Sequence, residues 1–220
     1  MGKKRVGVVL SGCGFLDGAE IHESVITLLA LDRAGAQVRV LAPEIPQSEV
    51  IDHRAGKPTT ERRNVLIEAA RISRGEIENV ARVRADDFDA IILPGGYGAA
   101  KNLSTFATAG KGLKVDADVE RLLRDARAAK KPLGFWCIAP VIAARLFGEL
   151  HVRLTIGNDA DTARALEALG AVHVDCLVDD IVVDDKLAIV TTPAYMLGPS
   201  IAPVAAGIEK GVAKVLSLAG

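Results

Sequence analysis

Short apolar runs alternate with longer helix-periodic segments along the 220-residue chain. Six apolar runs predict buried strands, at 6–10, 38–42, 90–96, 132–137, 152–157 and 187–193. Most are apolar continuously, which is typical of parallel strands covered on both faces. Six segments between them show helical periodicity, at 21–34, 64–72, 115–129, 138–147, 159–169 and 201–218. This order predicts a doubly wound α/β fold, a mostly parallel sheet with helices on both faces.

Two segments depart from this alternation. Residues 43–85 are too long for a plain crossover, and they contain a turn signal at 54–58 followed by a helical pattern with Thr60 as a possible cap. We interpret 43–85 as an insertion near the carboxyl edge of the sheet. Residues 173–184 resemble a short antiparallel excursion before the last strand. The chain shows no linker or internal repeat, so we expect one domain over 1–220.

Composition narrows the possible partners. The formal net charge is −1 and half of the residues are hydrophobic, which gives no electrostatic reason to expect nucleic acid or an anionic membrane as partner. The apolar run at 6–10 is too short to span a bilayer. The three cysteines are widely spaced and show no metal-binding pattern, so we expect free thiols, no metal and a cytoplasmic location.

In open α/β sheets, ligands bind outside the carboxyl ends of the strands. Four strand–helix junctions therefore carry the candidate chemistry, at 10–23, 93–104, 135–141 and 191–196. We expect a small pocket lined by these four loops.

The first junction reads LSGCGFLDGAEIHE. Asp17 and Glu20 have the spacing of a capping box, and we expect Asp17 to be the N-cap of the helix that follows. Glu23 lies beyond the cap. It is either a solvated first-turn acid favoured by the helix dipole or an acid that faces the pocket. Cys13 is a candidate for the pocket lining.

The second junction, LPGGYGAAKNL, follows a buried strand. The backbone amides of Gly95 and Gly96 could bind an oxyanion, or the glycines could simply form a tight turn into a helix. The stretch matches neither a Walker loop nor a dinucleotide-binding motif, and no cofactor is indicated. Asn102, near its end, is a further candidate for substrate binding.

The third junction places Cys137 between an apolar run and a helix that starts with Pro140. A cysteine at such a turn has the geometry of a nucleophile elbow, where the helix N-terminus stabilises a thiolate. The alternative is an ordinary buried cysteine. At the fourth junction, TTPAYM, the hydroxyls of Thr192 and Tyr195 could line the pocket.

None of the four histidines, at positions 22, 53, 151 and 173, is an obvious partner for Cys137. A Cys–His–Asp hydrolase is therefore disfavoured, and a cysteine with a nearby carboxylate remains.

These motifs together resemble the DJ-1/PfpI superfamily, which is related in fold to the class I glutamine amidotransferases. The PGG turn, the cysteine elbow and the helix in GAEIHESV carry the resemblance. Over the full length the chain is similar to the ElbB branch, named for enhancing lycopene biosynthesis and as sigma cross-reacting protein. SGCGFLDGAEIHE, PGGYGAAKNLS, PLGFWCIAP and RLTIGNDADTA are in the style of that branch.

The resemblance implies a flavodoxin-like α/β sandwich, usually a homodimer. It implies that Cys137 is the nucleophile, that Glu23 hydrogen-bonds it, and that the amides of Gly96 and Ile138 form the oxyanion site. It also implies a glutathione-independent glyoxalase of low turnover, a glyoxalase III-like lyase.

The leading hypothesis is conversion of glyoxal or methylglyoxal to a 2-hydroxy acid through a Cys137 hemithioacetal, with Glu23 as base. A different possibility is a non-enzymatic redox sensor in which Cys137 oxidises to a sulfinate stabilised by protonated Glu23. A glutaminase-like amidotransferase would need a His-x-Glu pair after the elbow, and the sequence has none.

Overall fold

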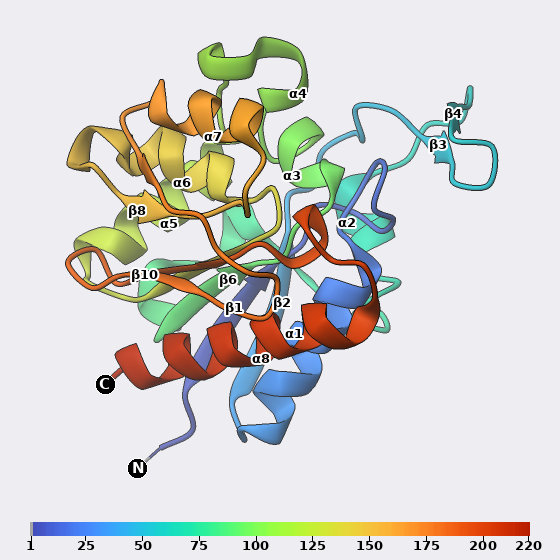
Figure 1. Ribbon diagram of the computed structural model, residues 1–220. Helices are drawn as coiled ribbons and strands as arrows, with labels where there is room; N and C mark the ends of the chain where they lie inside the picture. Colours follow the sequence, from blue (N-terminus) through green and yellow to red (C-terminus); the bar gives the residue numbers. More distant parts are fainter. Residues whose placement is uncertain (1) are drawn as a thin grey trace.

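The computed structural model describes residues 2–220 and is built around one seven-stranded sheet (Figure 1). The strand order is β10-β11-β7-β6-β1-β2-β5, and only β10 runs antiparallel to its neighbour. The strands of this sheet are β1 (Arg5–Val9), β2 (Gln37–Ala42), β5 (Glu78–Asn79), β6 (Ala90–Leu93), β7 (Leu133–Trp136), β10 (Val182–Asp184) and β11 (Ile189–Thr192). The predicted mostly parallel, flavodoxin-like α/β fold is confirmed.

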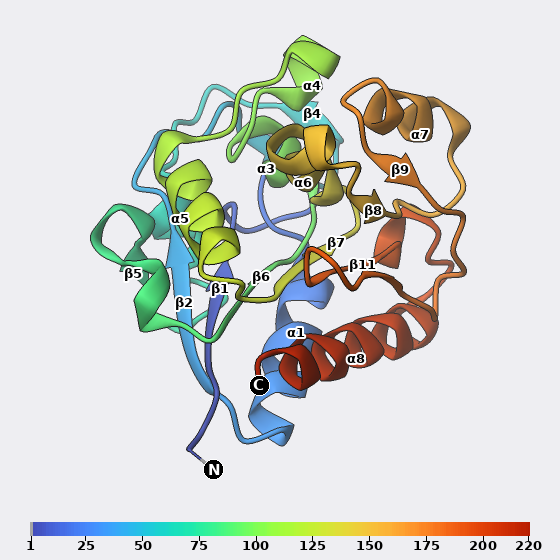
Figure 2. The same ribbon diagram turned by 90° about the vertical axis from the view of Figure 1, so that its left-hand side faces the viewer.

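Helices cover both faces of the sheet (Figure 2). The α-helices are α1 (Ile21–Arg33), α2 (Val65–Ala69), α3 (Tyr97–Lys101), α4 (Phe106–Ala109), α5 (Ala117–Ala128), α6 (Pro140–Phe147), α7 (Ala160–Glu167) and α8 (Ile201–Leu218). Single 3-10 turns lie at Val80–Arg82, Ala85–Asp87, Gly110–Gly112, Gly148–Leu150 and Ala194–Met196. Helices α1 and α8 pack together on one face, while α5 and α6 contact the other. No helix within 2–220 is long and apolar enough to cross a membrane.

The four central strands explain why the sequence shows continuous apolar runs. Every residue of β6, β7 and β11 is buried, as are the last four of β1, because side chains on both faces meet helices. Trp136 in β7 is fully buried and donates its indole N–H to Thr27 Oγ1 in α1 (3.1 Å). The ring fits because α8 carries Gly211 there, where a Cβ would stand 2.8 Å from it.

The strand predicted at 152–157 does not join the main sheet. It is reduced to β8 (Arg153–Leu154), which pairs in parallel with β9 (Val172–His173) in a separate two-stranded sheet. Side-chain oxygens from the main sheet accept hydrogen bonds from the backbone amides of this segment, in place of backbone carbonyls. Arg153 N donates to Asp184 Oδ2 (2.9 Å) and Thr155 N to Thr191 Oγ1 (3.0 Å). The antiparallel excursion predicted before the last strand is present as β10.

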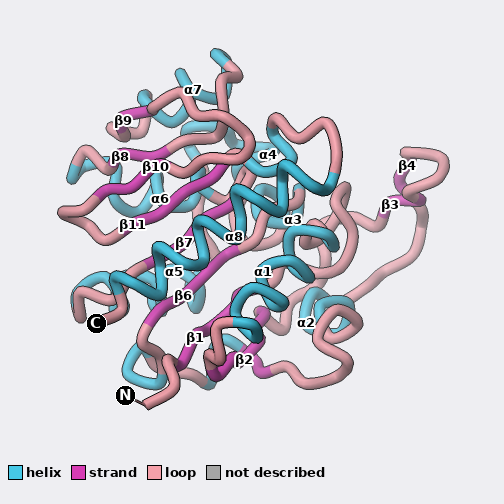
Figure 3. Tube along the Cα trace, turned by 60° about the horizontal axis from the view of Figure 1, so that its bottom comes forward, coloured by secondary structure: helices cyan, strands magenta, loops and turns pink. Residues whose placement is uncertain are grey.

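Residues 43–85 contain a hairpin, a short helix and an edge strand. The hairpin strands β3 (Ile51–Asp52) and β4 (Lys57–Pro58) project from the body of the molecule (Figure 3). Strand β5 adds to the β2 edge of the main sheet (Figure 2). The helical part is α2, which is shorter than the predicted 64–72. Its N-cap is Asn64 rather than Thr60, because the Asn64 side chain accepts bonds from the amides of Leu66 and Ile67.

Candidate active site

Cys137 occupies a strained turn between β7 and α6. Its φ is 59°, a left-handed conformation that is unfavourable for a residue with a side chain and is found preferentially at functional sites. The turn is held by two hydrogen bonds, from Cys137 N to Thr192 O (3.0 Å) and from Ala139 N to Trp136 O (2.9 Å). Cys137 is 7% exposed. The strained backbone therefore presents a nearly buried thiol at the carboxyl edge of the sheet.

Glu23 is fully buried in the first turn of α1 and faces Cys137. Its Oε2 accepts a bond from Gly95 N (2.8 Å) and its Oε1 accepts one from Tyr195 N (3.2 Å). The Cys137 thiol is close enough to act on the pKa of this carboxyl. Of the two alternatives that the sequence leaves open, the structure shows the acid that faces inward.

Gly95 and Gly96 permit this close approach. A Cβ on Gly95 would lie 2.3 Å from the Cβ of Cys137 and 2.8 Å from Glu23 Oε2. Gly96 has φ 92°, and a Cβ there would lie 2.3 Å from Glu20 N. The amides of Gly96 and Ile138 act on the cysteine sulfur and oppose the rise in the pKa of its thiol. These backbone donors favour negative charge at this point of the turn.

Burial controls the protonation of the pair. Burial raises the pKa of the Glu23 carboxyl to about 7, and the charge of Glu20 adds to the rise, while the amides of Tyr195 and Gly95 oppose it. Burial and then the charge of Glu23 also raise the pKa of the Cys137 thiol well above its usual value. The pair therefore holds at least one proton at neutral pH. Because the two groups interact, they titrate as a coupled pair.

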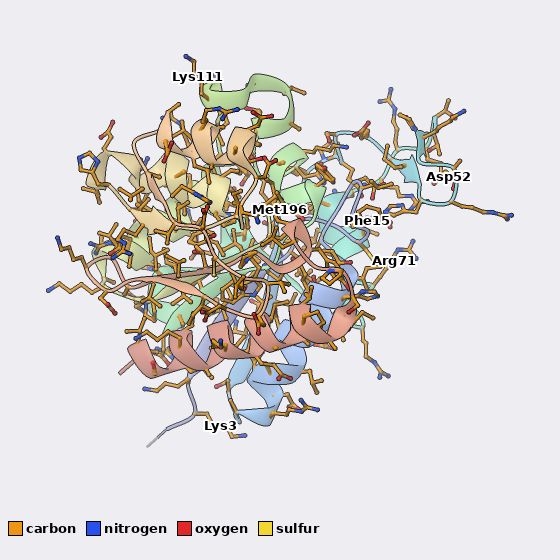
Figure 4. The ribbon with its side chains drawn as sticks, viewed as in Figure 1. Lys3, Phe15, Asp52, Arg71, Lys111 and Met196 are labelled. Atoms are coloured by element: carbon orange, nitrogen blue, oxygen red, sulfur yellow. The ribbon has the colours of Figure 1, made fainter. Side chains whose placement is uncertain are left out.

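A cavity of about 520 Å³ opens above the thiol. It is lined by Phe15, Glu20, Gly96, Tyr97, Ala100, Lys101, Phe106, Ala107, Cys137, Ile138, Thr162, Tyr195 and Met196. Figure 4 labels Phe15 and Met196 on the side of the molecule where the strands end. The cavity is larger than the small pocket predicted from the sequence.

A second hollow, of about 590 Å³, lies between α1, β2 and residues 72–78. Its lining includes the ion pair of Arg39 and Glu78 (2.7 Å) but no cysteine or histidine. We place the candidate active site at Cys137, because this cysteine lines a cavity and has a buried, proton-holding carboxyl, that of Glu23, beside it.

Five of the predicted site residues do not line the Cys137 cavity, namely Glu23, Gly95, Asn102, Thr192 and Cys13. Asn102 is buried, with Nδ2 donating to the carbonyls of Ser11 (2.9 Å) and Asp17 (2.8 Å), so its role is to hold the 10–20 loop. The Thr192 hydroxyl donates to Asp180 O (2.8 Å). Cys13 is half-buried, and the charges of Glu68, Arg71, Asp17 and Arg63 act on it.

The predicted cap at Asp17 is wrong. Helix α1 begins at Ile21, and its N-cap is Glu20, whose Oε2 accepts a bond from Glu23 N (2.7 Å). Asp17 lies too far upstream because residues 14–20 form a tight loop, in which Gly18 N donates to Gly14 O (2.6 Å). Instead, the buried Asp17 accepts a bond from Ile51 N (2.7 Å) and ties the hairpin to this loop.

No histidine lines the Cys137 cavity formed by residues 2–220. His22 bonds the Tyr195 hydroxyl through Nδ1 (2.8 Å), His53 contacts Ile51 O (3.0 Å), His151 contacts Gly170 O (3.2 Å), and His173 Nε2 accepts from Ile156 N (3.4 Å). The geometry contains no cysteine–histidine pair.

Most of the cavity wall lies outside the predicted site residues. Tyr97 directly follows the PGG turn, so its position at a strand end is a signal for it, and the capping-box spacing of Glu20 gives no sign that it lines the cavity. Phe106 and Thr162 come from helices outside the four junctions, and no pattern in the sequence connects them to Cys137.

No protein-family model matches the chain. A rat protein named ES1 protein homolog, mitochondrial, is 49% identical over 228 residues, which cover 99% of this chain and 85% of the rat protein. The chain belongs to the ES1 family. A human relative, glutamine amidotransferase-like class 1 domain-containing protein 3, mitochondrial, is 48% identical over 226 residues, covering 98% of this chain and 84% of that protein.

Solved structures support the same fold. The crystal structure of an isoprenoid biosynthesis protein with an amidotransferase-like domain from Ehrlichia chaffeensis has a TM-score of 0.92 and 35% identity, covering 98% of this chain and 99% of that one. A ThiJ/PfpI domain protein from Brachyspira murdochii has a TM-score of 0.61 at 19% identity, covering 98% of each chain. The DJ-1/PfpI resemblance is confirmed as a likeness of fold, while the ElbB branch stays a prediction.

The prediction of a cytoplasmic location is wrong. The rat, human and zebrafish members of the ES1 family are all named mitochondrial. The prediction depended on free cysteines, and free thiols exclude only the oxidising compartments. They do not distinguish one reducing compartment from another.

Proposed function

We propose that the protein is a glutathione-independent, glyoxalase-like enzyme that converts 2-oxoaldehydes to 2-hydroxy acids. The observation that carries this proposal is the buried Cys137–Glu23 pair, in which the carboxyl has a pKa of about 7. A group with that pKa can both take and return a proton near neutrality. Cys137 lines the cavity together with Gly96 and Ile138, and the Glu23 carboxyl is buried outside the lining. The amides of Gly96 and Ile138 favour negative charge beside the sulfur, which supports addition to a carbonyl.

In the first step the Cys137 sulfur bonds to the aldehyde carbon, and the thiol proton ends on the former carbonyl oxygen. The product is a hemithioacetal, whose oxygen is stabilised by the amides of Gly96 and Ile138 while it carries charge. The strained elbow keeps the sulfur directed toward the cavity.

Glu23 then removes the proton from the attacked carbon, and the electron pair moves into an enediol with the neighbouring carbonyl. Return of a proton to the second carbon gives a thioester of the 2-hydroxy acid. Water cleaves the thioester, releasing the acid and restoring the thiol. The sum is one 2-oxoaldehyde plus one water to one 2-hydroxy acid, with no external oxidant or reductant.

A second candidate function is redox sensing, favoured by the same carboxyl. Glu23 in its protonated form could donate a hydrogen bond to a Cys137 sulfinate formed with peroxide as oxidant. The raised pKa of the thiol does not distinguish the two functions, because the sulfur is the nucleophile both toward peroxide and toward an aldehyde. Intact mass after mild peroxide distinguishes the two, since sensing predicts two added oxygens in a protein without dicarbonyl turnover.

The direct test is a turnover screen of glyoxal and methylglyoxal on wild type, Cys137→Ala and Cys13→Ala. We expect Cys137→Ala to lose about a thousand-fold or more in kcat, because no step can begin without the sulfur. Cys13→Ala is the matched control and keeps wild-type turnover, because Cys13 lies outside the cavity. Equal turnover in wild type and Cys137→Ala would refute the proposal.

A further inference from the structure

The cavity above Cys137 is much larger than glyoxal or methylglyoxal. Its volume is about 520 Å³, within the range of roughly 300–1,000 Å³ that proteins use for drug-sized ligands. Methylglyoxal has only a handful of non-hydrogen atoms. With its aldehyde carbon at the sulfur, it would leave most of the cavity to water.

The additional space is walled by large apolar side chains. Phe15 and Tyr97 are 47% and 51% exposed, and Phe106 and Met196 line the cavity with them. They come from four separate segments: the 10–20 loop, α3, α4 and the turn after β11. Aromatic side chains gathered beside a nucleophile bind apolar groups by removing both surfaces from water.

The charges around the cavity disfavour an anionic substituent. Lys101 lines it, but its ammonium is paired with the Glu49 carboxylate and bonded to Leu16 O (2.9 Å). Glu20 also lines it and has no cationic partner among the ion pairs of residues 2–220. A carboxylate or phosphate on the substrate would therefore meet repulsion from Glu20 without a free cation to offset it.

We infer that the preferred substrates are 2-oxoaldehydes with an uncharged aryl or similarly bulky apolar substituent, which stands against Phe15, Tyr97 and Phe106 while the aldehyde carbon reaches Cys137. This inference rests on the proposed function. The bonds made and broken are those of the steps above. The substituent takes no part in them and contributes binding alone.

The test compares kcat/KM for phenylglyoxal and methylglyoxal, with the rate of Cys137→Ala subtracted to remove reaction at arginines. We expect wild type to favour phenylglyoxal by about ten-fold or more, mainly through a lower KM. Phe15→Ala should bring the two substrates several-fold closer together. Leu150→Ala, an exposed apolar residue outside the cavity, should leave both rates and their ratio unchanged.

A ratio of one or less in wild type, with methylglyoxal turned over, would overturn this inference and leave the proposed function standing. Absence of turnover with every dicarbonyl would instead refute the proposed function. The inference about the substituent is then tested by binding. Aldehydes that bind in the cavity should slow the alkylation of Cys137 by iodoacetamide, and the alkylation of Cys13 in the same sample is the internal reference. Benzaldehyde should protect at a concentration about ten-fold below that of acetaldehyde, and equal protection would overturn the inference.

Discussion

Two cysteines of this protein follow parallel strands and lie close to a buried glutamate. Cys13 follows β1 and is near Glu68, while Cys137 follows β7 and is near Glu23. Burial raises the pKa of both thiols, and the charge of the nearby glutamate adds to the rise in each case. Residue types alone would make them similar.

Their surroundings make them different. The Glu68 carboxylate is held by two guanidinium groups, those of Arg71 (2.9 Å) and Arg63 (3.4 Å), whereas Glu23 receives only neutral hydrogen-bond donors. Cys137 also has the positive φ and a cavity above it. Cys137 is therefore the candidate for catalysis because its backbone turn presents the thiol to a cavity and because no arginine neutralises the neighbouring glutamate.

The largest difference between the two regions should come from their glutamates. Glu23→Gln should lower kcat by about 10²–10⁴-fold, because the amide cannot exchange the substrate proton. Glu68→Gln should leave kcat unchanged and lower the free energy of unfolding by up to about 1 kcal/mol, because two partly solvent-exposed arginines lose their carboxylate. Kinetics and thermal unfolding of both variants measure this.

A folded Glu23→Gln protein with wild-type turnover would remove the distinction that we draw. Equal loss of activity in Glu68→Gln would do the same, since it would place the second glutamate in the reaction.

The next comparison concerns glycine. Gly95→Ala should lower kcat by about ten-fold or more and destabilise the fold by about 1–3 kcal/mol, because its methyl would overlap the Cys137 Cβ and approach Trp136 O to 2.9 Å. Gly112→Ala is the matched control, with nothing within 4 Å of its added Cβ and no positive φ. It should change neither activity nor the melting temperature. A fully active Gly95→Ala would show that the close approach is not needed.

The strands and the elbow could be predicted because each depends on local sequence. Continuous apolar runs predict β1, β6, β7 and β11, and a cysteine between such a run and Pro140 predicts the turn. The local sequence pattern does not predict the structure where contacts between distant residues determine it. Asp17 has the sequence spacing of a cap, yet it bonds Ile51 across the fold. The run at 152–157 is apolar, yet Asp184 and Thr191 take its amides.

The chemistry of the site was more predictable than its selectivity. Cys137, Glu23 and the glycines lie at strand ends and in the first helix turn, where the topology of an α/β sheet brings residues together. Phe106 and Thr162 reach the cavity only because α4 and α7 fold over it, and the sequence carries no sign of that packing. Cavity size depends on such segments, which is why a small pocket was predicted and a larger one was found.

The last comparison, which tests the shared proton, is the response to pH. The folded pKa of Glu23 is raised to about 7 from a reference of 4.5, so its neutral form is favoured by folding. The resulting stability is fully present below pH 4.5 and is lost as pH rises toward 7, up to a few kcal/mol. Glu23→Gln mimics the neutral form, so the difference in unfolding free energy between wild type and this variant should change across that window.

The activity should depend on the same proton, but it should rise with pH where the stability contribution falls. Glu23 acts as a base in its charged form, so wild-type kcat/KM should rise with pH and level off above an apparent pKa of about 7. At pH 6 the rate should be about one-tenth of the plateau. Cys13→Ala should retain both the rate profile and the stability profile. The contrary result is an unfolding free energy that depends on pH identically in wild type and Glu23→Gln between pH 4.5 and 7. Glu23 would then not have the raised pKa, and the Cys137–Glu23 pair would not hold the proton that we assign to it.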